Sequence, residues 1–143
     1  MNKKLAAAAM AAMMLAACSS SSDDAANSTA GTQTEATVTT DGAETTAVLT
    51  KEDGKLTGVS IDVVTEEGDS KKDLGADYNM KSDSKIGKEW NEQVEFLENY
   101  ILEHGVDSVK LDADGYAESE DVKSGCTINL KDIMQAVDEA NAK

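Results

Sequence analysis

The segment with the clearest chemical content is D-V-K-S-G-C-T, which spans residues 121–127. It places a carboxylate, two hydroxyls and a thiol within one short stretch. Gly125 permits a tight backbone approach or a positive φ. Thr127 presents a hydroxyl just before a predicted helix start, where free N–H groups and a positive partial charge suit a phosphate, and Lys123 is the nearest cation. In the alternative interpretation the hydroxyls only bond the turn backbone and the thiol is a small core residue.

An amphipathic helix is expected to follow this segment. Asn129 as the N-cap residue and Asp132 three residues later make a variant of the capping box. Ile133, Met134 and Val137 recur at helical spacing, so they are expected to face the core.

A second helix is predicted upstream from an apolar stripe at intervals of three and four residues. Its members are Ile86, Trp90, Val94, Leu97 and Ile101. His104 would lie in the last turn, interacting with the helix dipole, and Gly105 would form the C-terminal cap. Trp90 is expected in the core, with stacking on a ligand as the alternative.

Three threonine- and valine-rich runs precede these helices and predict strands at residues 34–40, 45–51 and 56–64. D-G dipeptides at residues 41–42 and 53–54 mark turns between them, so the strands should form an antiparallel meander. A short strand is also predicted at residues 106–111. Because strands and helices are segregated along the chain, the fold class is α+β, an antiparallel sheet packed with two main helices.

The polar connection at residues 66–84 is long for a structureless loop in a compact domain, which indicates mobility or function. Tyr78 and Met80 lie within it. We expect these two side chains to be exposed near a pocket.

The first residues predict export. Lys3 and Lys4 precede an apolar run at residues 5–17, which is too short to remain as a membrane-spanning helix. The run ends in L-A-A-C, which resembles the bacterial lipobox, and this resemblance implies cleavage after residue 17 and lipidation of the Cys18 sulfur. The protein would then be anchored to the cell membrane or envelope on its extracytoplasmic face. The alternative is an ordinary secretory peptide with an incidental cysteine.

Residues 18–31 are small and polar, and they read as a flexible tether to one domain at residues 32–143. Lipidation would consume Cys18, which leaves Cys126 as the one free thiol and permits no intrachain disulfide.

The charge balance excludes nucleic acid as a partner. The chain has 28 acidic and 13 basic residues, and every basic residue is a lysine. Loss of residues 1–17 removes Lys3 and Lys4, which takes the formal net charge from −15 to −17. Such a surface repels polyanions, and without arginine the chain lacks the bidentate clamp for phosphate.

Three segments together resemble the FMN-binding domain family of exported and membrane-attached bacterial proteins. The run at residues 121–127 is similar to that family's D-x-x-S/T-G-A-T motif. D-G-K-L-T-G-V-S-I-D at residues 53–62 is similar to a strand of the family. Y-N-M-K followed by I-G-K-E-W-x-E-Q, within residues 78–93, resembles a lipoprotein subgroup.

The resemblance implies a cofactor and its partners. Thr127 would be esterified to FMN through the flavin phosphate by a flavin transferase, within a motif formed by Asp121, Ser124, Gly125 and Cys126. Tyr78 and Met80 are further candidates for contacts with the cofactor. The protein would be an electron carrier that exchanges electrons with a membrane redox partner, holding and tuning a cofactor that does the redox chemistry.

A second interpretation remains open, a surface lipoprotein of the same fold that binds a small ligand or a protein without covalent flavin. Cys126 stands where the family usually has alanine, and the chain has only five aromatic residues in all. D-A-D-G-Y at residues 112–116 hints at calcium but lacks the EF-hand loop that ends in glutamate, so no metal site is expected. No self-sufficient catalytic set is visible, which favours a carrier or binding protein over an enzyme.

Overall fold

Three strands form an antiparallel sheet in the order β1-β2-β3. They are β1 (Thr32–Thr40), β2 (Ala43–Glu52) and β3 (Lys55–Val64), which confirms the predicted meander. Each hairpin closes through an Asp-Gly pair in which both residues have positive φ, at 50° and 86° for Asp41 and Gly42 and at 53° and 80° for Asp53 and Gly54. Two-residue turns of this type follow the natural twist of the strands and favour these residues.

The computed structural model describes residues 31–143, which form one compact unit. The predicted signal peptide, the lipidation site at Cys18 and nearly all of the predicted tether lie outside the described residues. Within the described part, no helix is long and apolar enough to cross a membrane.

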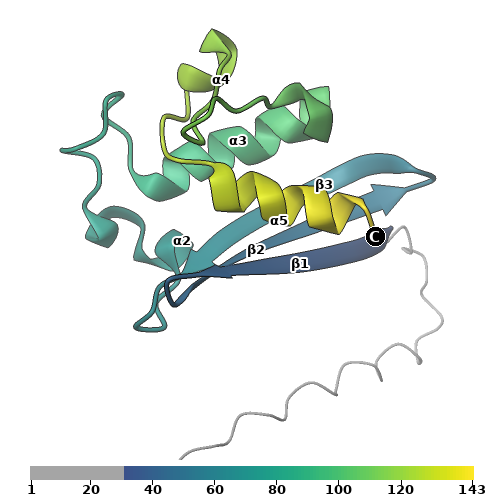
Figure 1. The fold of residues 1–143 in the computed structure, drawn as a ribbon, viewed down its shortest axis with the longest axis horizontal. Coiled ribbons are helices and arrows are strands. Elements are labelled where there is room, and N and C mark those ends of the chain that lie inside the picture. The colour runs from purple at the N-terminus through teal and green to yellow at the C-terminus, as the bar shows by residue number, and fades with distance from the viewer. Residues whose placement is uncertain (1–30) are drawn as a thin grey trace, which may run out of the picture. The chain divides into compact units, whose positions relative to one another are not determined.

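The two long helices, α3 (Trp90–His104) and α5 (Lys131–Asn141), cover one face of the sheet (Figure 1). α5 packs on β1 and β2, whereas α3 packs along β3. The sheet contributes alternate residues to the core between the layers: Ala36, Val38, Ala47, Leu49, Ile61 and Val63. On the opposite face the hydroxyls of Thr37 and Thr46 hydrogen-bond across the strands at 2.8 Å. The α+β class is therefore confirmed.

Helix α3 starts later than its apolar stripe suggested. Glu89 accepts from the backbone of Glu92, whose carboxylate accepts in return from the N–H of Glu89, so a capping box fixes the start at Trp90 and leaves Ile86 outside. The other four residues of the stripe are buried, including Trp90. His104 ends the helix, and Gly105 follows with φ 94° and donates its N–H to the carbonyl of Ile101, as expected.

One prediction about the connections is wrong. Residues 106–111 do not form a strand: Val106–Ser108 is a 3₁₀ turn, and only Leu111 makes a bridge, to Ala117. Within the described part of the chain, residues 106–111 therefore lack the partner strand that a β-strand needs for its backbone hydrogen bonds. The polar segment at residues 66–84 is not structureless, since it contains α2 (Lys71–Leu74) and a 3₁₀ turn at Gly75–Tyr78.

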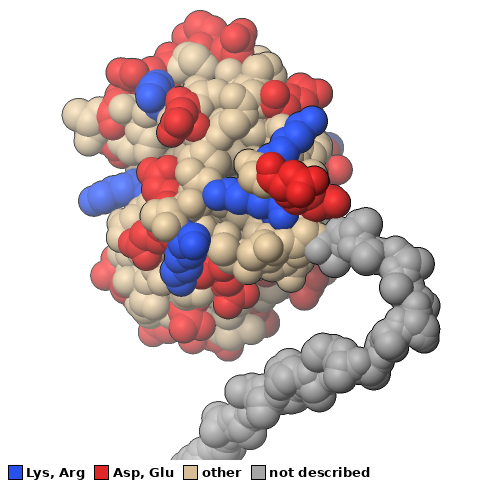
Figure 2. Space-filling view, turned by 90° about the vertical axis from the view of Figure 1, so that its right-hand side faces the viewer, with Lys and Arg blue, Asp and Glu red and all other residues tan. Residues whose placement is uncertain are grey.

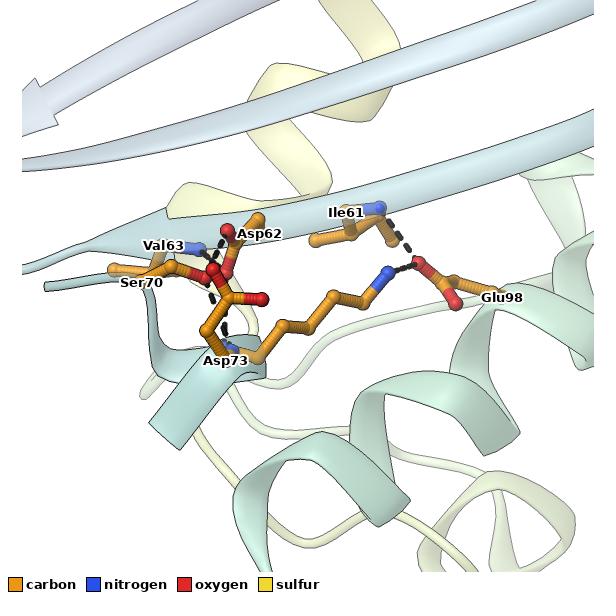
Figure 3. Close-up of polar contacts among 7 residues, drawn as sticks. Ile61, Asp62, Val63, Ser70, Asp73 and Glu98 are labelled. Atoms are coloured by element: carbon orange, nitrogen blue, oxygen red, sulfur yellow. Dashed lines mark hydrogen bonds and ion pairs between the residues drawn. The ribbon is translucent and has the colours of Figure 1, made fainter. Parts of the chain in front are cut away.

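Side chains close the outer edge of β3 (Figure 3). Glu98 of α3 accepts the N–H of Ile61 at 2.6 Å and forms an ion pair with Lys72. Asp62 accepts the hydroxyl of Ser70 at 2.5 Å and the N–H of Lys72 at 3.2 Å. These contacts satisfy an edge N–H that could otherwise pair with another chain, and they fix α2 against the sheet.

Candidate functional site

The first part of the D-x-x-S-G-C-T motif lies in and just after the one-turn helix α4 (Glu120–Lys123). The hydroxyl of Ser124 donates to the carbonyl of Asp121 at 2.7 Å, while both side chains are exposed. The N–H groups of Gly125 and Cys126 both donate to the carbonyl of Val122, at 3.1 and 2.8 Å. Asp121 and Ser124 therefore shape the turn, as the alternative interpretation expected of the serine.

Gly125 allows α3 to approach the motif. A Cβ atom at this position would lie 2.4 Å from the ring of Phe96, far inside any real contact. Its φ is not positive, so close approach, rather than unusual backbone geometry, is what requires glycine here. Phe96 in turn stacks with Tyr100 at a centroid distance of 6.2 Å, and Tyr100 stacks with His104 at 4.3 Å.

Thr127 is bound to α3 through Gln93. The backbone N–H of Thr127 donates to Oε1 of Gln93 at 2.8 Å, and its hydroxyl lies 3.3 Å from the same oxygen. The amide nitrogen of Gln93 donates to the hydroxyl of Ser84 at 3.1 Å and to the carbonyl of Lys88 at 3.2 Å. Gln93 is fully buried, so this satisfied amide holds the motif, α3 and the 84–88 turn in one arrangement.

Cys126 is a buried core thiol. Its removal from water raises the pKa of the thiol to about 11, and a backbone hydrogen bond from Ile128 only partly offsets this effect. The group is therefore protonated at neutral pH and is neither a nucleophile nor a metal ligand there.

A cavity of about 250 Å³ opens beside Thr127. Its walls come from two lysines, an aromatic residue and three residues that include the end of the motif: Lys85, Lys123, Tyr116, Ala117, Cys126 and Thr127. Lys123 is half-exposed and also contacts Glu120 at 3.3 Å. The sequence analysis did not mark Lys85, Tyr116 or Gln93 as site residues, because their only signal was a place within the segments at residues 78–93 and 112–116, which were noted for other reasons.

The turn at residues 112–116 positions Tyr116 at the mouth of this cavity. Asp112 accepts the N–H of Tyr116 at 3.0 Å and that of Asp114 at 2.9 Å, and these bonds, the one from Tyr116 foremost, lower the pKa of the Asp112 carboxyl. The carboxylate thus organises its own turn. Across the described part of the chain, no three acidic, histidine or cysteine side chains gather in a way that could hold a metal ion.

The last helix does not begin as predicted. α5 starts at Lys131, and the cap position is Leu130, which makes no side-chain cap. Asn129 accepts the N–H of Lys131 at 3.0 Å and donates to the carbonyl of Asp114 at 2.8 Å, so it braces the entry without a capping box. Thr127 hydrogen-bonds to α3 rather than to the first turn of α5, and two lysines line the cavity that it borders.

Tyr78 and Met80 do not line this cavity. Both are half-buried against the core near the start of α3, where the N–H of Met80 donates to Glu89 at 2.7 Å. The Tyr78 ring lies 5.1 Å from the ammonium of Lys71. The structure thus brings together Gly125, Cys126 and Thr127 of the predicted site and places Tyr78 and Met80 elsewhere.

Comparisons with known proteins give a fold and no function. No protein-family model and no curated protein matches the chain. A solution NMR structure of a structural-genomics target from Clostridium thermocellum is similar, with 24% sequence identity and a TM-score of 0.51. The match covers 78% of this chain and 88% of that one. At this identity the likeness concerns the fold alone.

Proposed function

We propose that the protein is a lipid-anchored flavin carrier of the FMN-binding-domain type, in which FMN is attached through its phosphate to Thr127. The observation that carries the proposal is the position of Thr127 in the wall of a cavity that also contains two lysines, Lys85 and Lys123. The sequence motif and the L-A-A-C run at residues 15–18, which resembles a lipobox, are independent support.

The electrostatics of this cavity differ from those of the molecule as a whole. The chain carries a formal charge of −15, and on the face in Figure 2 a few lysines lie among a larger number of acidic side chains. Two lysines in the wall of one small cavity, of which Lys123 also contacts Glu120, therefore form a local concentration of positive charge that suits a phosphodiester anion. A covalent bond at Thr127 would offset the general repulsion of anions by this surface.

The hydrogen bonds of Thr127 are compatible with esterification. Its hydroxyl makes only a 3.3 Å contact to Gln93, while the shorter 2.8 Å bond to the same oxygen comes from the backbone N–H. Loss of the hydroxyl proton would remove the weaker interaction and leave the bond that positions the residue. The buried amide of Gln93 would remain satisfied.

The size of the cavity suits the phosphate end of the cofactor. A volume of about 250 Å³ lies below the ~300–1,000 Å³ of most small-molecule pockets, so it does not enclose a whole flavin. Tyr116, which is 43% exposed at the same cavity, is the aromatic side chain available to the isoalloxazine ring. Bound FMN would supply electron transfer, and the protein would hold and orient it.

Thr127→Val tests the assignment, with Thr39→Val, which changes an exposed threonine of β1 outside the motif, as the matched control. Each full chain is produced in an exporting bacterial host with an active flavin transferase. Wild type and the Thr39 variant should be yellow and flavin-fluorescent after denaturing electrophoresis, and the Thr127 variant colourless. Covalent flavin in Thr127→Val would overturn the assignment.

The alternative, a lipoprotein of this fold that binds a small ligand, is favoured by one further observation. A second cavity of about 300 Å³ lies apart from the Thr127 motif and shares none of its lining residues.

A further inference from the structure

The second cavity lies among residues from both layers of the fold. Its apolar walls come from β2, β3, α3 and α5, and its polar walls from β2, α2, α5 and the segment just before α5. The lining residues are Ala43, Thr45, Val63, Lys71, Trp90, Asn129, Asp132 and Ile133. Its volume of about 300 Å³ reaches the lower end of the range for small-molecule pockets, ~300–1,000 Å³.

This cavity has one fixed cation and one anion that do not pair with each other. Lys71 and Asp132 both line it, yet no ion pair forms between them, and neither has a salt-bridge partner elsewhere in the described part of the chain. Asp132 also accepts no hydrogen bond from another described side chain. Two opposite charges that share a cavity without meeting leave room for a ligand that carries both complementary charges.

The structure holds the lysine in place. The ammonium of Lys71 lies 5.1 Å from the ring centroid of Tyr78 and 5.7 Å from that of Trp90, within the range of cation–π attraction. The neighbouring residue Lys72 is tied to Glu98 and Asp62 at the edge of β3, which fixes the short helix (Figure 3). Lys71 is therefore preorganised toward the cavity.

A third polar side chain lines the cavity. Thr45 is a largely buried residue, 5% exposed, in the wall of this space. Its hydroxyl can donate a hydrogen bond to a polar ligand or accept one from it. Ala43, Val63, Trp90 and Ile133 surround these groups with apolar surface.

We propose that this cavity binds a small zwitterion, namely a free α-amino acid with an apolar side chain. Its carboxylate pairs with Lys71, its ammonium pairs with Asp132, and its side chain contacts Trp90 and Ile133. A net-neutral ligand also suits a protein of formal charge −15, which would repel a free carboxylic acid anion. The site does not depend on flavin at Thr127.

Trp90 provides the readout, because it is the only tryptophan in the chain and lies in the wall of the cavity. The purified full chain, produced without a flavin transferase, is titrated with L-leucine while Trp90 fluorescence is recorded. We expect a saturable change. 4-Methylpentanoate lacks the ammonium and 3-methylbutylamine lacks the carboxylate, so each should bind roughly tenfold more weakly or worse.

Variants distinguish this site from general binding. Lys71→Gln and Asp132→Asn should each weaken leucine binding at least about tenfold, whereas Lys131→Gln, an exposed neighbour on α5, should bind as wild type does. Circular dichroism checks that each variant is folded, and Thr45→Val gives a second test through the loss of a hydroxyl from the cavity wall. Absence of a saturable response to leucine and to L-methionine would overturn the proposal. Equal binding by wild type and the two charge variants would also overturn it.

Discussion

The backbone N–H of Thr127 and the buried side-chain oxygen of Gln93 are joined by a 2.8 Å hydrogen bond across 34 positions of sequence. This bond connects the D-x-x-S-G-C-T motif to α3, and the other end of the same amide reaches the turn that contains Ser84 and Lys88. The position of the proposed acceptor hydroxyl thus depends on a residue outside the motif.

Gln93→Met should destabilise the fold and lower the yield of flavin on Thr127. The change leaves the Thr127 N–H without its buried acceptor, a loss of ~1–3 kcal/mol in the free energy of unfolding. Urea unfolding of the flavin-free chain measures the first effect, and covalent flavin content measures the second. Gln135→Met on the exposed face of α5 is the control and should change neither.

Gly125→Ala should destabilise the protein because the new methyl group would lie 2.4 Å from the Phe96 ring. We expect a loss of ~1–3 kcal/mol from overpacking. The cost should fall when Phe96→Ala is introduced as well, since the smaller side chain removes the clash. A double-mutant cycle in urea tests this point, and additive effects would contradict the proposed contact.

The buried thiol predicts a specific pH dependence. The pKa of Cys126 is raised from 9.0 to about 11 in the folded protein, so the unfolded chain loses its thiol proton first as pH rises. The stability that the protonated thiol provides is complete below pH 9 and is lost between pH 9 and about pH 11. The difference in unfolding free energy between wild type and Cys126→Ala should therefore shrink over this interval. A constant difference would show that the thiol is not desolvated.

Glu98 should contribute both as an acceptor and as a charge. Glu98→Ala removes the acceptor of the Ile61 N–H and the ion pair with Lys72, and it should cost ~1–3 kcal/mol. Glu98→Gln keeps an oxygen for the edge N–H and should cost less. Comparison of the two variants by urea unfolding separates the contributions, and equal losses would mean that the acceptor role contributes nothing.

The lysines at the Thr127 cavity should assist flavin attachment. Lys85→Gln with Lys123→Gln removes both ammonium groups from the cavity, so the rate of covalent loading by the transferase should fall while Thr127 remains available. Lys88→Gln, an exposed lysine outside the cavity, is the control. Unchanged loading of the double variant would exclude an electrostatic role for these two residues.

Short sequence patterns were enough to predict the strands and helices, whereas the candidate site is formed by contacts between residues far apart in the sequence. Alternating strands, two Asp-Gly turns and the apolar stripe of α3 are properties of short segments, so the meander and the main helices followed from sequence. The start of α3 was set by the capping box between Glu89 and Glu92, which the apolar stripe does not reveal. Residues 106–111 did not form a strand because no partner strand lies beside them among the described residues. Gln93 reaches Thr127 through the packing of α3 against the motif, and Lys85 and Tyr116 reach the same cavity from two separate loops. No local pattern encodes either arrangement.

The same distinction applies to Tyr78 and Lys71. Tyr78 was selected as a candidate because aromatic residues are rare in this chain and it lies in a polar segment. In the structure its ring contacts Lys71, which belongs to the short helix α2 that was not predicted from the sequence. The second cavity is likewise assembled from residues of five elements, so only the folded chain shows it.

The most direct test of the central proposal is the mass of one tryptic peptide from the full chain, produced with an active flavin transferase. Cleavage after Lys123 and Lys131 releases S-G-C-T-I-N-L-K, in which Ser124 and Thr127 are the only hydroxyl side chains. We predict a gain of one FMN less one water, with fragment ions that place it on Thr127. An unmodified peptide, or a gain on Ser124 alone, would contradict the flavin assignment.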